Sequence, residues 1–176
     1  MLPDASLYLI GMPGAGKTTL GRALATRLEM PFRDLDQEIV AQQGRNIPEI
    51  FAAEGEAYFR AAEAAVLRTV VAEQPRLVLA TGGGTPCFHQ NMSALLTTGT
   101  VLYLAVPVEE LAQRVRRAAA ARPLLAALPD EKALITHLSE TLAFRRQFYD
   151  QAPLRCDGPC GVEAVLQLLT RYHSTG

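Results

Sequence analysis

The sequence predicts an α/β fold, a parallel sheet with helices on its faces, in one domain over residues 1–176. Short apolar runs alternate with longer stretches of helical periodicity, and a glycine-rich turn separates the first run from the first helix. Strands separated by helices need crossover connections, which build parallel sheets. The length of 176 residues suits one well-buried core and is short for two.

Each expected element follows from an apolar run and the turn residues that bound it. The strands are the short runs 7–10, 32–34 after Pro31, 77–80, 101–105 and 154–156. The helices have apolar residues at three- and four-residue spacing: about 17–28, 37–73 with breaks at Gly44 and Gly55, 91–98, 108–117, 130–149 and 162–172. The Ala- and Pro-rich stretch 118–128 is either a helix end with a solvated basic face or a mobile cover over an anionic ligand.

The charge balance excludes several classes of protein. Seventeen basic and 18 acidic residues leave a formal net charge of −1, which offers no overall footprint for nucleic acid or an anionic membrane. The sequence has no run of about 18 apolar residues and no recognisable secretory leader. We therefore expect a cytoplasmic protein that binds neither nucleic acid nor membrane, and from its size a monomer.

The three cysteines are Cys87, Cys156 and Cys160. An odd number without a secretory leader argues against a disulfide framework. C-x3-C with no histidine nearby is not a usual zinc spacing. We expect all three to be small apolar fillers or loop thiols.

Residues 11–18, GMPGAGKT, match the phosphate-binding pattern G-x-x-x-x-G-K-[ST] between an expected strand and an expected helix. In this pattern backbone N–H groups and the helix start surround a phosphate chain, the lysine reaches the β- and γ-phosphates, and the hydroxyl is offered to Mg²⁺. Lys17 is one of only two lysines among the 17 basic residues. A lysine retained in an arginine-rich chain favours a role that needs an ammonium group.

The remaining residues narrow the class of nucleotide-binding protein. The only other lysine, Lys132, follows Glu131, so the N-K-x-D motif of a guanine-specific G domain is absent. A large motor or transporter ATPase requires a chain longer than 176 residues. A small-molecule kinase fits, because phosphoryl transfer requires mainly positioning and charge neutralisation.

Further candidate residues follow two of the expected strands. Asp34 and Asp36 form D-x-D at the end of the second strand, and glycines 82–84 follow the third, so both lie at the carboxyl edge of the sheet where ligands bind. Asp36 is either a helix N-cap or the acceptor of a proton from a substrate hydroxyl. The triple glycine is either a flexible loop or a close approach of backbone to ligand.

Together these motifs resemble those of the shikimate kinase family over essentially the whole chain, 7–172. The matching stretches are GMPGAGKTTLGR at 11–22, RDLDQEI at 33–39, EGEAYFR ending at Arg60, ATGGGTP at 80–86, ARPLL at 121–125 and a late arginine before Phe-Tyr. The resemblance implies a three-layer P-loop kinase fold with a five-stranded parallel sheet, a mobile lid at about 113–128 and a substrate-binding helical region at about 36–62. It also implies ATP with Mg²⁺ and transfer of the γ-phosphoryl group to the 3-hydroxyl of shikimate. The products are shikimate 3-phosphate and ADP, in aromatic amino-acid (chorismate) biosynthesis.

The resemblance assigns roles residue by residue. The implied nucleotide-binding residues are Gly14, Ala15, Gly16, Lys17, Thr18, Thr19, Arg117 and Pro159. The implied metal site is Thr18, with Asp34 assisting through water. The implied substrate-binding residues are Asp36, Arg60, Gly82, Gly83, Gly84 and Arg145. The implied catalytic groups are Lys17 at the phosphates, Asp36 as base and Arg122 in the lid, where it stabilises charge on the transferred group.

Two of these assignments leave a choice between neighbouring arginines. Either Arg116 or Arg117 resembles the adenine-stacking position, opposite the loop 157–159. The family commonly has R-x-P-L-Y where this chain has RRQFY at 145–149. Arg145 and Arg146 point in different directions on a helix, and counting back from Tyr149 favours Arg145 for the substrate carboxylate.

Two other functions compete with this prediction. A gluconate-type sugar-acid kinase shares the phosphate loop and an anionic substrate, but D-x-D, the triple glycine and RPLL argue against it. A non-catalytic nucleotide-binding module is expected to lose the base or the lid arginine, and both Asp36 and Arg122 are present.

Overall fold

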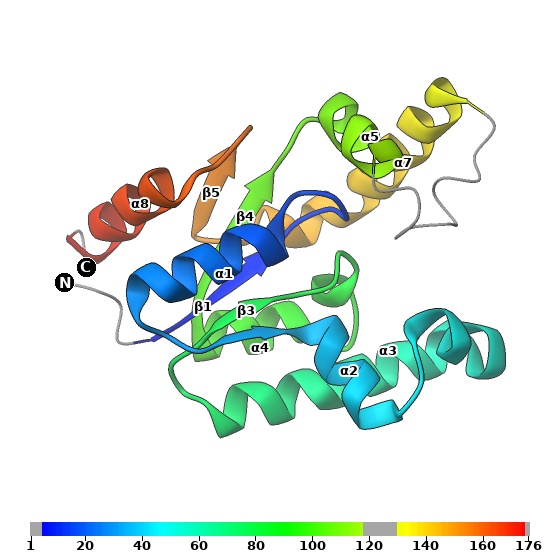
Figure 1. Ribbon diagram of the computed structural model, residues 1–176, viewed down its shortest axis with the longest axis horizontal. Helices are drawn as coiled ribbons and strands as arrows, with labels where there is room; N and C mark the ends of the chain where they lie inside the picture. Colours follow the sequence, from blue (N-terminus) through cyan, green and yellow to red (C-terminus); the bar gives the residue numbers. More distant parts are fainter. Residues whose placement is uncertain (1–4, 118–129, 175–176) are drawn as a thin grey trace.

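The computed structural model describes residues 5–117 and 130–174, and shows a five-stranded parallel sheet with helices on both faces (Figure 1). The strands are β1 (Ser6–Ile10), β2 (Phe32–Asp34), β3 (Val78–Ala80), β4 (Gly99–Ala105) and β5 (Leu154–Asp157). The helices are α1 (Lys17–Leu28), α2 (Leu35–Gln43), α3 (Ile47–Glu73), α4 (Asn91–Thr98), α5 (Val108–Arg117), α7 (Glu131–Tyr149) and α8 (Val162–Ser174), with a short 3₁₀ helix η1 (Thr85–Cys87). The predicted fold class is confirmed.

The order of the strands places the phosphate-binding loop at the point where ligands bind in such sheets. The order is β2-β3-β1-β4-β5, so the chain builds the sheet to one side of β1 and then to the other. Leu7 of β1 lies opposite Val78 of β3 and Thr100 of β4. The loop that leaves β1 therefore opens at the topological switch point, at the carboxyl edge of the sheet.

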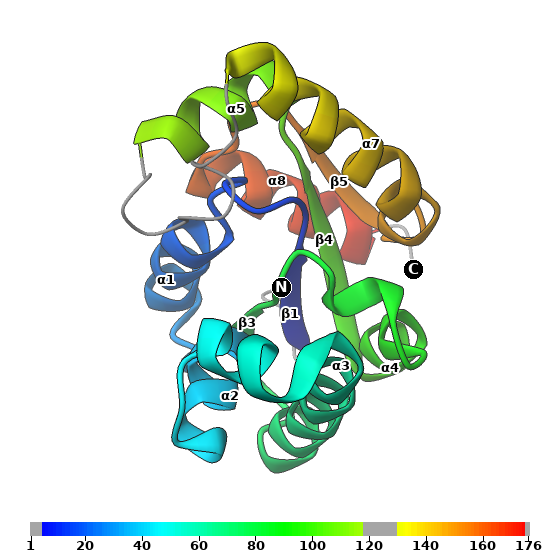
Figure 2. The same cartoon turned by 90° about the vertical axis from the view of Figure 1, so that its right-hand side faces the viewer.

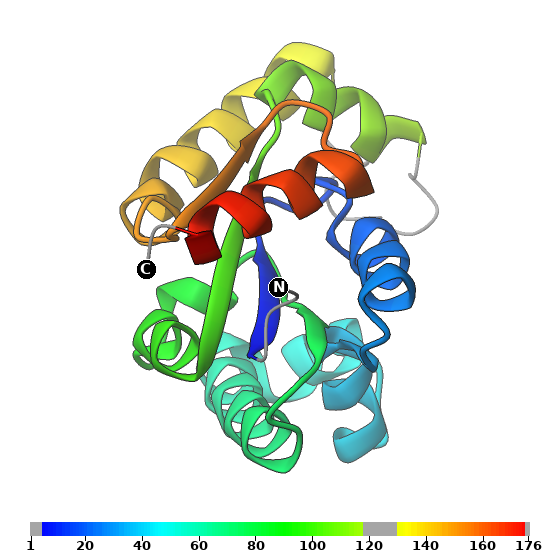
Figure 3. The ribbon, with the colours of Figure 1, turned by 90° about the vertical axis from the view of Figure 1, so that its left-hand side faces the viewer.

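Helices on both faces bury the central strands. Residues 7–10 of β1 are fully buried, as expected for a parallel strand covered on both sides. Helices α1 and α8 contact each other, and Figure 3, which looks onto the opposite, amino edge of the sheet, shows α8 in front of the strands. Figure 2 looks onto the carboxyl edge, where α2 and α3 lie on one side and α5 and α7 on the other. The carboxyl edge of the sheet thus lies between two groups of helices.

The helical region predicted over 37–73 differs in detail from the structure. It consists of α2 and α3, separated at Gly44, which adopts φ 65° as the C-cap of α2. Gly55 does not end α3 but kinks it, with φ 80°. The N-cap of α2 is Asp34, whose Oδ1 accepts a hydrogen bond from the backbone N–H of Asp36 at 3.1 Å, so the alternative of Asp36 as a cap is wrong. Among the described helices, none is both long and apolar enough to cross a membrane.

The division of the chain into one domain, lid and substrate-binding region stays a prediction. Residues 36–62 fall on α2 and the first part of α3. Of the expected lid, 113–128, only the part up to Arg117 is described, at the end of α5. The predicted catalytic residue Arg122 lies outside the described residues.

Candidate active site

The phosphate-binding loop curls around the ammonium group of Lys17. The Nζ atom of Lys17 donates to the carbonyl oxygens of Gly11 at 2.8 Å and Met12 at 3.0 Å, and the residue is 8% exposed. Gly16 precedes α1 with φ 93°, a conformation that favours glycine, and no side chain caps the helix there. The first N–H groups of α1 are therefore directed at the loop without a side-chain acceptor, which is the arrangement that binds phosphate.

Thr18 and Asp34 form a pair of hard oxygen donors beside this loop. The hydroxyl of Thr18 donates to Asp34 Oδ2 at 2.6 Å, which joins the start of α1 to the end of β2. Mg²⁺ prefers one or two such protein oxygens together with phosphate oxygens and water. The pair fits that ion. Within residues 5–117 and 130–174 no cluster of three or more His, Cys, Asp or Glu side chains offers another metal site.

Asp36 lies close enough to the phosphate loop and to the glycine loop to interact with charged residues beside both. Desolvation by the surrounding protein, with the negative charges of Asp34 and Glu63, raises its pKa from 3.8 to about 6, against the opposing effect of Lys17 and Arg60. The side chain nevertheless keeps solvent access at the mouth of the site. A carboxylate with a pKa near neutrality is suited to accept a proton.

The three glycines after β3 let functional side chains approach the backbone. A Cβ atom on Gly84 would lie 2.5 Å from Nη2 of Arg60, and one on Gly83 would lie 2.7 Å from Nη1 of Arg145. A Cβ on Gly82 would meet Asp36 Oδ1 at 3.2 Å. Arg60, Arg145 and Asp36 therefore lie close to the glycine loop, and a close approach of its backbone to a ligand stays a prediction.

Arg60 is held by a buried carboxylate that the sequence analysis did not single out. Its Nη1 atom lies 2.9 Å from Oε2 of Glu63, whose side chain is 1% exposed. Glu63 also accepts from the hydroxyl of Thr85 at 2.6 Å, and Arg60 makes a second, longer ion pair with Glu56 at 3.3 Å. The spacing of three residues in FRAAE, which places Arg60 and Glu63 on one side of a helix, was the available indication.

Arg145, not Arg146, faces the glycine loop. Arg145 lies beside Gly83, whereas Arg146 is 61% exposed and pairs with Asp150 on the same helix at 3.4 Å. Tyr149, one turn after Arg145, donates its hydroxyl to the carbonyl oxygen of Gly83 at 2.5 Å. The face of α7 that carries Tyr149 and Arg145 is thus fixed against the loop.

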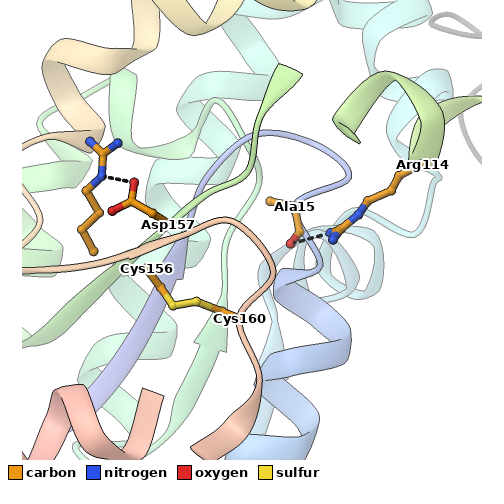
Figure 4. Close-up of a disulfide and its surroundings, with 6 residues drawn as sticks. Ala15, Arg114, Cys156, Asp157 and Cys160 are labelled. Atoms are coloured by element: carbon orange, nitrogen blue, oxygen red, sulfur yellow. Dashed lines mark hydrogen bonds and ion pairs between the residues drawn. A yellow bond between two sulfur atoms is a disulfide. The ribbon is translucent and has the colours of Figure 1, made fainter. Parts of the chain in front are cut away.

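A second pocket adjoins the phosphate loop on the side of α8. It is lined by Ala15, Gly16, Thr19, Leu20, Ala23, Leu104, Arg114, Gly158, Pro159, Cys160, Gly161 and Val162. Arg114 donates to the carbonyl oxygen of Ala15 at 3.2 Å (Figure 4). It also donates to the carbonyl oxygen of Gly14 at 3.2 Å and pairs with Glu110. The sequence favoured Arg117 here, but Arg117 is exposed and does not line the pocket. Arg114 was not singled out from the sequence, although its spacing of three residues from Arg117 places it on a neighbouring part of the same helix.

Cys156 and Cys160 form a disulfide at the border of this pocket (Figure 4), which corrects the expectation that all cysteines are thiols. Their Cα atoms are 6.2 Å apart, within the range of disulfides. The bond closes the loop that carries Gly158 and Pro159. Cys87, the free cysteine, lies in η1, where burial raises the pKa of its thiol to about 11.

A phosphate loop facing a carboxylate and two arginines across the carboxyl edge of a parallel sheet defines a P-loop kinase. Comparison with known proteins then narrows the class, because the sequence model of the family described as "Shikimate kinase" matches residues 13–160. The chain belongs to the shikimate kinase family.

Individual relatives agree with this assignment. The chain is 38% identical over 148 residues to a shikimate kinase of Azobacteroides pseudotrichonymphae, covering 84% of this chain and 86% of the relative. A shikimate kinase structure from Bacteroides thetaiotaomicron superimposes with a TM-score of 0.85 at 34% identity, covering 97% of both chains. One from Acinetobacter baumannii, in complex with shikimate, gives 0.84 at 37% identity, covering 97% of this chain and 94% of that one.

A gluconokinase from Sinorhizobium meliloti, a representative of the competing class, shares the fold only. It is 16% identical, with a TM-score of 0.60 over 97% of this chain and 94% of its own. The likeness reflects the common P-loop kinase scaffold and carries no information about substrate.

Proposed function

We propose that the protein transfers the γ-phosphoryl group of ATP to the 3-hydroxyl of shikimate, giving shikimate 3-phosphate and ADP. The observation that carries the proposal is the position of Asp36, whose charge interacts both with Lys17 in the phosphate loop and with Arg60 beside the glycine loop. A hydroxyl held at Asp36 lies between a phosphate site and a site for an anion. Shikimate has a hydroxyl and a carboxylate on one small ring.

Arg60 and Arg145 are the groups that we assign to the carboxylate of shikimate. Guanidinium groups bind carboxylates through paired, charge-assisted hydrogen bonds. Both arginines lie against the glycine loop, at Gly84 and Gly83, and we assign the backbone groups of Gly82, Gly83 and Gly84 to the ring between them. This clamp orients the ring so that its 3-hydroxyl meets Asp36.

In the reaction, Asp36 orients the 3-hydroxyl and accepts its proton as the hydroxyl oxygen bonds to the γ-phosphorus and the bond from that phosphorus to the bridging β–γ oxygen breaks. Lys17 leaves its carbonyl partners for the β- and γ-phosphate oxygens and neutralises the charge that the leaving group gains. Thr18, with Asp34, holds Mg²⁺, which when bound neutralises phosphate charge. Arg122 is proposed to stabilise the transferred group from the lid, whose closure excludes water.

For the nucleotide base we propose the pocket between Arg114 and Pro159. It continues from the phosphate loop residues Gly14, Ala15, Gly16, Thr18 and Thr19, and an arginine face opposite a proline ring suits a flat aromatic base. Arg117 stays a competing prediction. From the length of 176 residues we propose a monomer, and we propose the cytoplasm, where ATP is supplied to biosynthetic enzymes.

The test is an ADP-release assay with purified protein, ATP, Mg²⁺ and shikimate. We expect turnover with shikimate that Asp36→Asn reduces by about 10²-fold or more, because the variant cannot accept the proton. Arg22→Gln, a surface arginine on α1, is the matched control and retains activity. Full activity on gluconate with none on shikimate would overturn the proposal.

A further inference from the structure

We propose that Phe88 is a positioning residue that sets the plane of the Arg60 guanidinium for the substrate carboxylate. The proposal rests on the role proposed for Arg60 above. The guanidinium carbon of Arg60 lies 4.3 Å from the centroid of the Phe88 ring and 5.1 Å from that of Phe59. The Arg60 side chain is 11% exposed. Two aromatic rings therefore contact a cation in a largely desolvated place, where such contacts are strongest.

The ring supplies a constraint that the acidic partners of Arg60 do not supply. Glu63 and Glu56 accept from separate guanidinium nitrogens and fix their positions along the edge of the group. The Phe88 ring, whose centroid lies 4.3 Å from the guanidinium carbon, adds a contact to the group as a whole, and in this proposal that contact restrains rotation of the guanidinium plane. Because a carboxylate is bound by two coplanar N–H groups, the plane decides whether both bonds can form.

Phe88 is itself held by a strained turn. His89 and Gln90, which follow it, adopt φ 48° and 56°, left-handed values that are uncommon outside glycine. Such conformations persist where the surrounding structure determines them, and often lie at functional sites. Here the backbone N–H of Asn91 donates to the carbonyl oxygen of Phe88 at 2.9 Å, which closes the turn directly behind the ring.

Arg68 fixes this turn to the helix that carries Arg60. Its Nη2 atom donates to the carbonyl oxygen of His89 at 2.6 Å, and its Nη1 atom donates to Oδ1 of Asn91 at 2.9 Å. Asn91 is fully buried and donates in turn to the carbonyl oxygen of Thr85 at 2.9 Å. Helix α3 thus provides both the arginine of the clamp and the arginine that places the ring against it.

The experiment is a double-mutant cycle on kcat/KM for shikimate, with Phe88→Leu, Arg60→Met and the double variant. We expect Phe88→Leu to raise the KM for shikimate about fivefold, in the lower part of the range for cation–π contacts because leucine keeps some packing against Arg60, while kcat and the KM for ATP stay within about twofold. Phe88→Tyr, which keeps the ring, retains the wild-type KM. In the Arg60→Met background Phe88→Leu has no further effect, because its action passes through Arg60.

Arg68→Gln tests the proposed role of Phe88 without changing the ring itself. It replaces Phe88→Leu as the test if that variant does not fold. It raises the KM for shikimate about threefold and leaves the KM for ATP unchanged. Its control is Arg76→Gln, since Arg76 donates to the backbone carbonyl of Leu28 away from the site and its loss changes neither KM.

An equal loss of kcat/KM from Phe88→Leu in both backgrounds overturns the proposal, and so does an unchanged KM in Phe88→Leu. Failure of the underlying function is seen separately. If the wild type does not phosphorylate shikimate, the proposed function is wrong. If Arg60→Met has normal kcat/KM, the carboxylate clamp is wrong.

Discussion

Glu63, buried in α3, accepts a hydrogen bond from the hydroxyl of Thr85 at 2.6 Å. Its other carboxylate oxygen pairs with Arg60, so one side chain joins α3 to η1, which directly follows the glycine loop. Its negative charge also raises the pKa of Asp36 across the site. The following predictions start from these connections.

Replacing Glu63 by Gln is expected to lower the pKa of Asp36, because it removes a neighbouring negative charge that raises this pKa. The acidic limb of the kcat/KM profile then moves to lower pH, since Asp36 stays deprotonated further into acid. A pH–rate profile measures the shift. Glu56→Gln, which also removes an ion pair to Arg60 but lies outside the groups that perturb Asp36, leaves the limb in place. A shift to higher pH in Glu63→Gln would contradict the prediction.

Replacing Asp36 by Asn is expected to stabilise the fold at alkaline pH while it abolishes turnover. The folded state raises the pKa of Asp36 from 3.8 to about 6, so the folded protein binds the proton more tightly. The resulting stabilisation is fully present below pH 3.8 and is lost as the pH rises through about 6. Thermal unfolding should therefore give Asp36→Asn a higher Tm than the wild type at pH 8 and little difference at pH 4. A lower Tm at pH 8 would refute the assigned charge environment.

Replacing Gly84 by Ala is expected to raise the KM for shikimate about tenfold through displacement of Arg60. The new Cβ would lie 2.5 Å from Nη2 of Arg60, the end of a flexible side chain. The backbone of Gly84 has φ −87°, which alanine adopts without strain, so the protein still folds. Steady-state kinetics with each substrate varied checks this, and the KM for ATP serves as the internal control. An unchanged KM for shikimate would exclude contact between Arg60 and the substrate.

Arg114 and Arg117 give opposite expectations for the adenine pocket. Arg114→Met should weaken ADP binding about fivefold, because Arg114 lines the pocket beside the phosphate loop. Arg117→Met, the matched change one helical turn further on, should leave the Kd unchanged because Arg117 is exposed. Isothermal titration with ADP measures both. The reverse result would restore the assignment made from sequence.

Removing the disulfide is expected to lower the free energy of unfolding by about 2 kcal/mol, the loop-closure value for a ring of about five residues. Cys156→Ser and Cys160→Ser should give the same loss in urea titrations. Adding a reductant to the wild type should reproduce this loss and should have no effect on either variant. Equal stability of wild type and variants under oxidising conditions would mean that the bond does not form in solution.

The strands, the phosphate loop and the D-x-D pair were predictable because they depend on neighbours in the chain. Alternation of apolar runs with helical periodicity determines an α/β fold, and Gly11 to Thr18 form their loop through local backbone conformation. The choice of Arg145 over Arg146 could also be predicted from the sequence. Tyr149 is buried, and a residue four positions earlier on a helix shares its face.

The sequence by itself therefore determined the fold class and the family, and it indicated candidate site residues whose roles stay predictions. Only the tertiary structure decided that Arg114 reaches the phosphate loop, that Glu63 holds Arg60, and that Cys156 and Cys160 meet. The physical reason is the same in each case. These contacts depend on how far a helix is rotated against its neighbour, or on how a loop closes. Helix rotation and loop closure are both set by packing between segments that are distant in the chain, and no local sequence pattern records that packing.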